Sequence, residues 1–250
     1  MREIALAVKL KNKEIIEFLS ANVKSKLDFC KTVITNFCDN NFSYLLIACD
    51  EDFSKACESV IKDNIIDYIE SVYKIDYLKQ KIKALQSDNL AFNAYVKVLA
   101  LFDKSTDESA LSKIIMLNQT FFVDSFLEFR LSPLKKHWDN LATLSSDNLA
   151  VLNNSSFLDV IKFLLNTIDS VVYKVKVVYD GYNFNIYDMK DRNASVKKIA
   201  VCSDSLDLIF KVLNSCPNYI DIYLNSNDNH EAVNFLSNVF ANRLKIYTKS

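Results

Sequence analysis

Apolar residues follow two different periods along this chain. Between residues 51 and 168 they recur every three or four positions, as they do on one face of a helix. Toward both ends of the chain they alternate with other residues, which is typical of strands that are buried on one face. The pattern therefore predicts an α+β fold with a helical middle and with strands near both termini.

Residues 1–50 are predicted to form a strand-helix-strand unit. Apolar residues alternate from Ile4 to Leu10, and Asn12 can cap a helix that reaches residue 19 and can extend to residue 37. The sequence FSYLLIAC, residues 42–49, is apolar on both faces and predicts a buried strand. A helical crossover between the two strands allows them to be parallel.

Residues 51–168 are predicted to form a helical region. One helical face carries Phe53, Ala56, Val60, Ile61, Ile65, Tyr68, Ile69 and Val72. Further helices are expected over 76–85, 90–102, 107–121, 133–144 and 157–168. Ser105 or Asp107 is the expected cap of the 107–121 helix, and Ser132 precedes Pro133 at the start of the next.

Residues 169–250 are predicted to form a β-hairpin followed by a βαβαβ mixed sheet. Alternating runs flank Asp180 and Gly181, a dipeptide that strongly favours a two-residue turn. Such a turn pairs Tyr179 with Tyr182, and Val175 with Ile186. Gly181, the only glycine in the chain, stands where a positive φ is required. After the hairpin, three strands alternate with two helices, a pattern typical of parallel pairing.

The composition excludes several classes of function. The 250-residue chain is 50% hydrophobic with a formal net charge of −1, which is typical of a globular protein and argues against nucleic acid as a partner. A single glycine excludes the glycine-rich phosphate loops of nucleotide-binding proteins. The six cysteines and two histidines lack the spacing of metal ligands, and no catalytic constellation is visible, so we expect no metal, no cofactor and no enzymatic activity.

Cellular location is also predicted from apolar runs and thiols. The apolar run near the N-terminus is interrupted by Lys9, which is a poor pattern for a signal peptide. No uncharged apolar run reaches the roughly 18 residues that a membrane helix needs. Cys30, Cys38, Cys49 and Cys57 lie among apolar residues and are expected to be buried thiols. We therefore expect a cytoplasmic protein without a membrane span.

The segment 121–138, FFVDSFLEFRLSPLKKHW, holds the only tryptophan and stands between the two patterns. Phe126, Phe129 and Trp138 are expected to have structural roles, and Arg130 lies between apolar residues before a proline-started helix. Two interpretations of Arg130 stay open. It either pairs within its own chain, with a carboxylate such as Asp124 or Glu128 or with the free carbonyls that close the preceding helix, or it holds an anionic ligand or a partner's carboxylate.

The sequence VDSFLEFRLSPL resembles a motif of the YtxC-like sporulation proteins of endospore-forming Firmicutes. The order of later segments is also similar, from FLDVIKFLLNTI through VYKVKVVYDGYNFNIYD to NFLSNVFANRLKIY, although Ser125 stands where that family has glycine. The resemblance covers roughly residues 63–247. It implies a sporulation-associated cytoplasmic protein, and it supplies no catalytic residue.

Two hypotheses of different classes follow. The first is a non-enzymatic interaction or regulatory protein of spore formation, whose partner is another protein. The alternative is a nucleic-acid- or nucleotide-binding domain in which aromatic residues of the C-terminal sheet stack on bases. Its candidate residues are Tyr173, Tyr182, Phe184 and Tyr187. Their shared alternation instead favours packing against helices.

Overall fold

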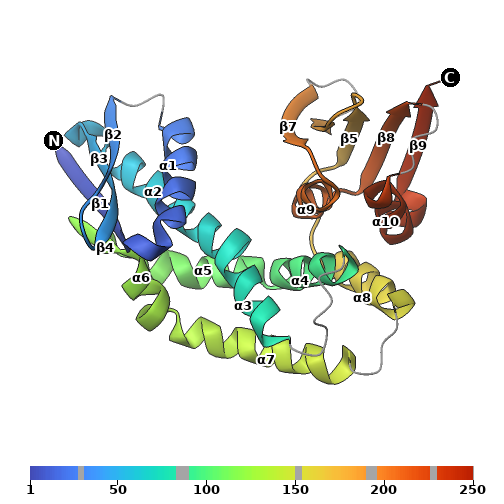
Figure 1. Cartoon of the computed structure of the whole chain (residues 1–250), viewed down its shortest axis with the longest axis horizontal. Coiled ribbons are helices and arrows are strands. Elements are labelled where there is room, and N and C mark those ends of the chain that lie inside the picture. Colours follow the sequence, from blue (N-terminus) through green and yellow to red (C-terminus); the bar gives the residue numbers. More distant parts are fainter. Residues whose placement is uncertain (28–30, 83–89, 150–153, 190–195, 226–229, 250) are drawn as a thin grey trace. The chain divides into compact units, whose positions relative to one another are not determined.

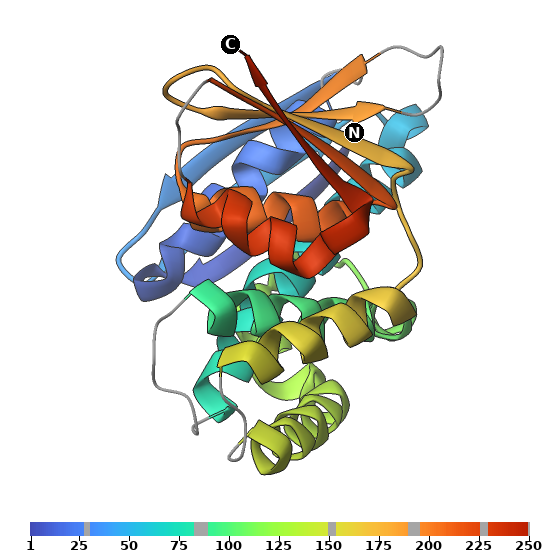
Figure 2. The ribbon, with the colours of Figure 1, turned by 90° about the vertical axis from the view of Figure 1, so that its right-hand side faces the viewer.

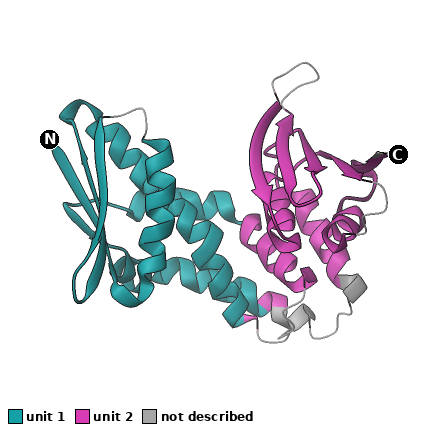
Figure 3. Cartoon of the chain, turned by 45° about the horizontal axis from the view of Figure 1, so that its top comes forward, with its two compact units in different colours: residues 1–81, 103–143 teal, residues 82–102, 144–250 magenta. Residues whose placement is uncertain are grey.

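The computed structural model describes residues 1–27, 31–82, 90–149, 154–189, 196–225 and 230–249 (Figure 1). The chain forms two compact units, and each of them draws on two stretches of sequence (Figure 3). Unit 1 contains residues 1–81 and 103–143, and unit 2 contains residues 82–102 and 144–250. The helical region expected between residues 51 and 168 therefore contributes to both units.

A four-stranded sheet lies in unit 1. Its strands are β1 (Arg2–Lys9), β2 (Thr32–Cys38), β3 (Phe42–Cys49) and β4 (Thr120–Phe122), in the order β2-β3-β1-β4. Along β3 every second residue is buried, so Leu45 and Ile47 face the core while Tyr44 and Leu46 face outward. Helix α1 (Lys13–Lys26) packs against β1 and β3 on the inner face.

Three expectations about this sheet are wrong. Residues 32–38 form strand β2 instead of extending α1, and β1 pairs antiparallel with β3. The reason is the turn after β2, where Asp39 Oδ1 accepts hydrogen bonds from the backbone N–H groups of Asn41 and Phe42, both at 2.7 Å. The third wrong expectation is the helix predicted to reach residue 121. Residues 120–122 instead form strand β4, which pairs parallel with β1.

The helices of unit 1 include two turns of π-helix. The first, η3 (Ile69–Tyr73), joins α2 (Ser54–Tyr68) to α3 (Lys74–Lys81). The second, η5 (Phe126–Arg130), follows the short α6 (Val123–Ser125). The remaining elements are η1 (Leu10–Asn12), η2 (Glu51–Phe53), α5 (Lys104–Ile114) and α7 (Ser132–Leu149). Pro133 lies in the first turn of α7, where its missing N–H costs nothing.

The described part of unit 2 contains a five-stranded mixed sheet, four α-helices, the 3-10 turn η6 (Ala241–Arg243) and the last residues of α7. Its strands are β5 (Lys174–Tyr179), β6 (Phe184–Met189), β7 (Val196–Cys202), β8 (Tyr219–Asn225) and β9 (Leu244–Lys249), in the order β7-β6-β5-β8-β9. Figure 2 shows α9 (Ser205–Ser215) and α10 (Glu231–Phe240) together against one face of this sheet. Helices α4 (Leu90–Phe102) and α8 (Asn154–Thr167) pack against α9 and α10, respectively. The α+β class and the mixed C-terminal sheet are confirmed.

The predicted hairpin is present, but its register is shifted by two residues. Tyr179 pairs with Phe184 and Val175 with Asp188, so the loop has four residues instead of two. Asp180 explains the longer loop, because its Oδ1 accepts hydrogen bonds from the backbone N–H groups of both Tyr182 and Asn183. A shift of two keeps each side chain on its predicted face of the sheet.

No helix in the described stretches combines the length and the apolar character that crossing a membrane requires.

With one glycine in the chain, other residues adopt positive φ. Gly181 has a φ of +100°, and Ala241, which follows α10, has a φ of +43°. We expect Gly181→Val to lower the free energy of unfolding of unit 2 by about 1 kcal/mol or more, because a β-branched residue is strained there. Ala241→Gly should raise it by roughly 0.5–1 kcal/mol for the opposite reason. Thermal unfolding followed by circular dichroism measures both, and shifts of the same sign would contradict this account.

Candidate functional site

The 121–138 segment presents one side to the core of unit 1 and another to solvent. Phe126 is buried, and its ring lies 5.3 Å from that of Phe121. Phe129, three residues later, is 70% exposed, and Arg130 beside it is also exposed. Of the residues expected to be structural, Phe126 therefore lies in the core, whereas Phe129 does not.

An apolar hollow of about 750 Å³ lies on the exposed side of the segment. Four of the large apolar side chains at this hollow are exposed to solvent, and they are Ile114, Met116, Phe122 and Phe129. Arg130 and Lys113 supply positive charge to the same hollow, and none of its lining residues is acidic. An exposed apolar surface of this kind beside an arginine is typical of a protein-interaction site.

The guanidinium group of Arg130 forms no hydrogen bond or ion pair with the described residues. Asp124, its expected partner, lies elsewhere: it accepts hydrogen bonds from the backbone N–H of Lys9 and from Asn12 Nδ2. These bonds fasten α6 to the end of β1. No contact thus supports the pairing of Arg130 with Asp124, and the group is available to an acceptor outside the chain.

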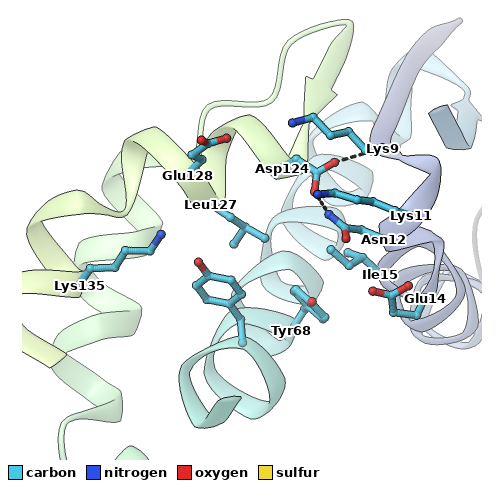
Figure 4. Close-up of a pocket in the computed structure, with 11 residues that line it drawn as sticks. Lys9, Lys11, Asn12, Glu14, Ile15, Tyr68, Asp124, Leu127, Glu128 and Lys135 are labelled. Atoms are coloured by element: carbon cyan, nitrogen blue, oxygen red, sulfur yellow. Dashed lines mark hydrogen bonds between the residues drawn. The ribbon is translucent and has the colours of Figure 1, made fainter. Parts of the chain in front are cut away.

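A second, more polar hollow of about 310 Å³ lies on the other side of the same segment (Figure 4). Three lysines line it, Lys9, Lys11 and Lys135, together with three carboxylates, Glu14, Asp124 and Glu128. The charges balance, so this hollow does not concentrate one kind of ion. Burial raises the pKa of Tyr68, which lies in it, to about 12, so its hydroxyl stays protonated at neutral pH. Neither feature points to acid–base catalysis.

Behind the segment, Trp138 is fully buried and belongs to a cluster of charged side chains. Its Nε1 donates a hydrogen bond of 2.7 Å to Asp107 Oδ2. The same oxygen lies 2.6 Å from Lys74 Nζ, which is also 3.3 Å from Glu70 Oε2. Lys74 and Asp107 are both 0% exposed. The cluster links η3 and α3 to α5 and α7, so it fixes the start of α7 just after Arg130.

Sequence reasoning missed this cluster. Asp107 was expected to cap a helix, but α5 begins at Lys104 and Asp107 faces inward from its first turn. Glu70 and Lys74 are four residues apart, a spacing that usually indicates an exposed ion pair. Only the placement of both residues next to buried apolar positions, such as Ile69 and Ile75, could have indicated burial.

The histidines and Asp204, which could in principle take part in chemistry, do not line either of the two hollows at the 121–138 segment. His137 Nε2 is 3.0 Å from Asp103 Oδ2 near the surface of unit 1, whereas His230 lies in unit 2 against the rings of Tyr179 and Phe184. Asp204 caps α9 by accepting a hydrogen bond from the N–H of Asp207, as expected.

The thiols also differ from one another. Cys49 and Cys57 are buried as expected, whereas Cys38 is exposed on the edge strand β2. Cys30 lies outside the described residues. Burial raises the pKa of Cys202 to about 12, which leaves its thiol protonated and unreactive at neutral pH.

Comparisons with protein-family models, with curated proteins and with solved structures found no match to this chain.

The buried cluster predicts a pH dependence. Burial is the largest cause that raises the pKa of Glu70 from 4.5 to about 7. Between these values the folded protein keeps a proton that the unfolded chain has released, so stability falls as pH rises through this window. A tenfold change in proton affinity is worth about 1.4 kcal/mol, so the loss is at most about 3 kcal/mol.

We expect Glu70→Gln to remove this loss and to make unit 1 more stable than the wild type at pH 8. Urea unfolding at pH 5 and pH 8, followed by the fluorescence of Trp138, measures the difference in unit 1. Glu17→Gln on the exposed side of α1 is the matched control, and it should leave the difference between the two pH values in place. An unchanged difference in Glu70→Gln would show that Glu70 does not hold the proton.

Proposed function

We propose that this chain is a non-enzymatic interaction protein of the cytoplasm, associated with sporulation, and that its 121–138 segment binds a protein partner. The sporulation context rests on the resemblance of this segment to the YtxC-like proteins. The binding role rests on one observation: Arg130 and Phe129 are adjacent and exposed beside a large apolar hollow.

The chemistry of these two side chains defines the partner. Arginine and aromatic residues dominate the energetics of protein interfaces, because each combines apolar area with directed contacts. The guanidinium group of Arg130 can donate two parallel hydrogen bonds to a carboxylate. The hollow beside it accepts an apolar side chain. The partner is therefore a protein segment that carries an acidic residue next to a bulky apolar one.

The apolar surface continues from this hollow onto the outer face of the unit 1 sheet. Phe122 contributes to both, and its ring lies 5.7 Å from that of Phe42 on β3. Farther along the sheet, Tyr44 stacks on Phe37 at 4.6 Å. Phe37 and Phe122 are exposed and Phe42 and Tyr44 are half-buried, so this aromatic surface offers a partner more area than the hollow alone.

The residues that line the polar hollow also argue for a binding role of this segment and against a catalytic one. The hydroxyl of Tyr68 stays protonated near neutral pH, and the balanced charges of the hollow do not set one carboxylate apart as a base. Asp124, the carboxylate nearest to the segment's start, is occupied by Lys9 and Asn12.

Arg130→Met tests the proposal, because it keeps most of the side chain's length and removes its donors. We expect the free energy of unfolding, followed by Trp138 fluorescence, to stay within about 0.5 kcal/mol of the wild type, since the group is exposed. In a spore-forming host that depends on this gene, the number of heat-resistant spores should fall. Lys24→Met, an equal loss of charge on the exposed side of α1, should leave both values unchanged.

A photo-crosslinking residue at position 129 tests the contact directly. Irradiation during sporulation should yield one discrete adduct with another protein, and Arg130→Met should abolish it. If the spore count and the adduct both survive Arg130→Met, the 121–138 segment is not the binding site. If Arg130→Met instead lowers stability by 1–3 kcal/mol, the arginine has a structural partner and the proposal is wrong.

A further inference from the structure

The sheet of unit 2 has two unlike faces. Its inner face is apolar: Val175, Val177, Ile220 and Ile222 are each 0% exposed there, beneath α9 and α10 (Figure 2). Since side chains alternate along a strand, the residues between them point to the other face. No helix among the described residues of unit 2 packs on that outer face (Figure 2).

Strand register places a row of basic and aromatic residues across this outer face. Lys176 on β5 pairs with Tyr187 on β6, which pairs with Lys198 on the neighbouring β7. On its other side Lys176 pairs with Asp221 on β8, which pairs with Lys245 on β9. At about 4.8 Å between neighbouring strands, the row crosses roughly 19 Å of sheet.

A second row brings aromatic rings next to these lysines. Tyr223 on β8 and Tyr247 on β9 are register partners, and their rings stack 4.8 Å apart at an interplanar angle of 13°. Lys176 Nζ lies 4.7 Å from the centre of the Tyr223 ring. Tyr247 is 41% exposed at the edge strand, so one face of this stack is open to a further planar group.

Positive charge predominates on this face. Asp221 is buried and already paired, because Lys174 Nζ lies 2.5 Å from its Oδ2. A hollow of about 470 Å³ opens beside this pair, and its lining adds Arg243 and Lys245. Asp180 lies at the end of the hairpin, where backbone N–H groups and the Asn185 amide hold its carboxylate. The open face thus carries Lys174, Lys176, Lys198 and Lys245 against the paired Asp221, and Arg243 lines the hollow at the start of β9.

We propose that the outer face of the unit 2 sheet binds single-stranded nucleic acid. Lysines along the rows contact phosphates, and the Tyr223–Tyr247 stack accepts a base on its open side. A flat sheet with exposed rings suits unstacked bases, whose faces are free, and not the closed stack of a duplex. A peptide rich in aspartate and glutamate would satisfy the lysines, but these residues have no aromatic ring for the stack.

Fluorescence anisotropy of the purified full-length chain with a labelled 20-nucleotide oligo-dT tests this proposal. We expect saturable binding at 50 mM salt that weakens steeply at 300 mM, because bound phosphates release counterions. The same sequence as a duplex with oligo-dA should bind more weakly, and poly-glutamate should not compete. Absence of oligo-dT binding at 50 mM salt, or equal binding of the duplex, would overturn the proposal.

Two variants separate stacking from charge. Tyr247→Leu keeps an apolar edge but removes the ring, and it should weaken oligo-dT binding about fivefold or more without changing the salt dependence. Lys176→Gln combined with Lys245→Gln should lower the slope of log Kd against log salt by about 1.4, or 0.7 for each phosphate that is no longer neutralised. Lys211→Gln, on the exposed side of α9, is the control for the removal of a lysine.

The outcomes are distinguishable. Equal weakening by Lys211→Gln and by the double variant indicates general attraction to a polyanion and overturns the assignment to this face. Binding that Tyr247→Leu leaves unchanged overturns the role of the stack. Arg130→Met should not alter oligo-dT binding, so the result does not depend on the protein-binding role proposed for unit 1.

Discussion

The buried ion pair between Lys74 and Asp107 constrains the arrangement of the helices in unit 1. Both side chains are removed from water, so loss of Lys74 would leave buried carboxylates without their cation, at a cost of about 3–5 kcal/mol. The indole of Trp138 shares the acceptor oxygen of Asp107, which ties α7 to α5. Because α7 begins two residues after Arg130, a contact buried in the core restricts where the exposed arginine and Phe129 can lie. The candidate interaction surface is thus supported by a polar core, and not by apolar packing alone.

The sequence predicted correctly those features of the fold that depend on neighbouring residues in the chain. Alternation located β5, β6 and β8, and the requirement for positive φ located Gly181, because both depend on neighbouring residues. The direction of β1 relative to β3 depends on the Asp39 turn, and the pairing of β4 with β1 joins residues more than one hundred positions apart. Neither is visible in a local period. The same holds for the candidate site: the sequence singled out Arg130, but its exposure depends on Asp124 being bound to the end of β1.

The net charge of the chain did not indicate the basic face of the unit 2 sheet, and the reason is again that this face depends on the fold. The total of −1 is an average over the whole surface, whereas a partner meets one face. In unit 2 the lysines of β5, β7 and β9 share a face only because the register aligns them, and that face is open only because α9 and α10 both cover the other. Of the aromatic residues first considered for stacking, Phe184 is buried, whereas Tyr187 lies in the row on the open face. Tyr223 and Tyr247 were not among those candidates, and they lie on the same open face.

The interleaving of the two units along the chain has a consequence during synthesis. The ribosome releases α4 before any other element of unit 2, and this helix is apolar around most of its circumference. Its packing partners α8 and α9 emerge only after a further fifty to one hundred residues, roughly ten seconds at an elongation rate of about 5–20 residues per second. In that interval unit 1 can fold, because β4, Asp107 and Trp138 are synthesised before α8 and α9. The apolar surface of α4 stays exposed to solvent during this time. Nascent chains of this protein should therefore be clients of holding chaperones, with α4 as the segment that they bind.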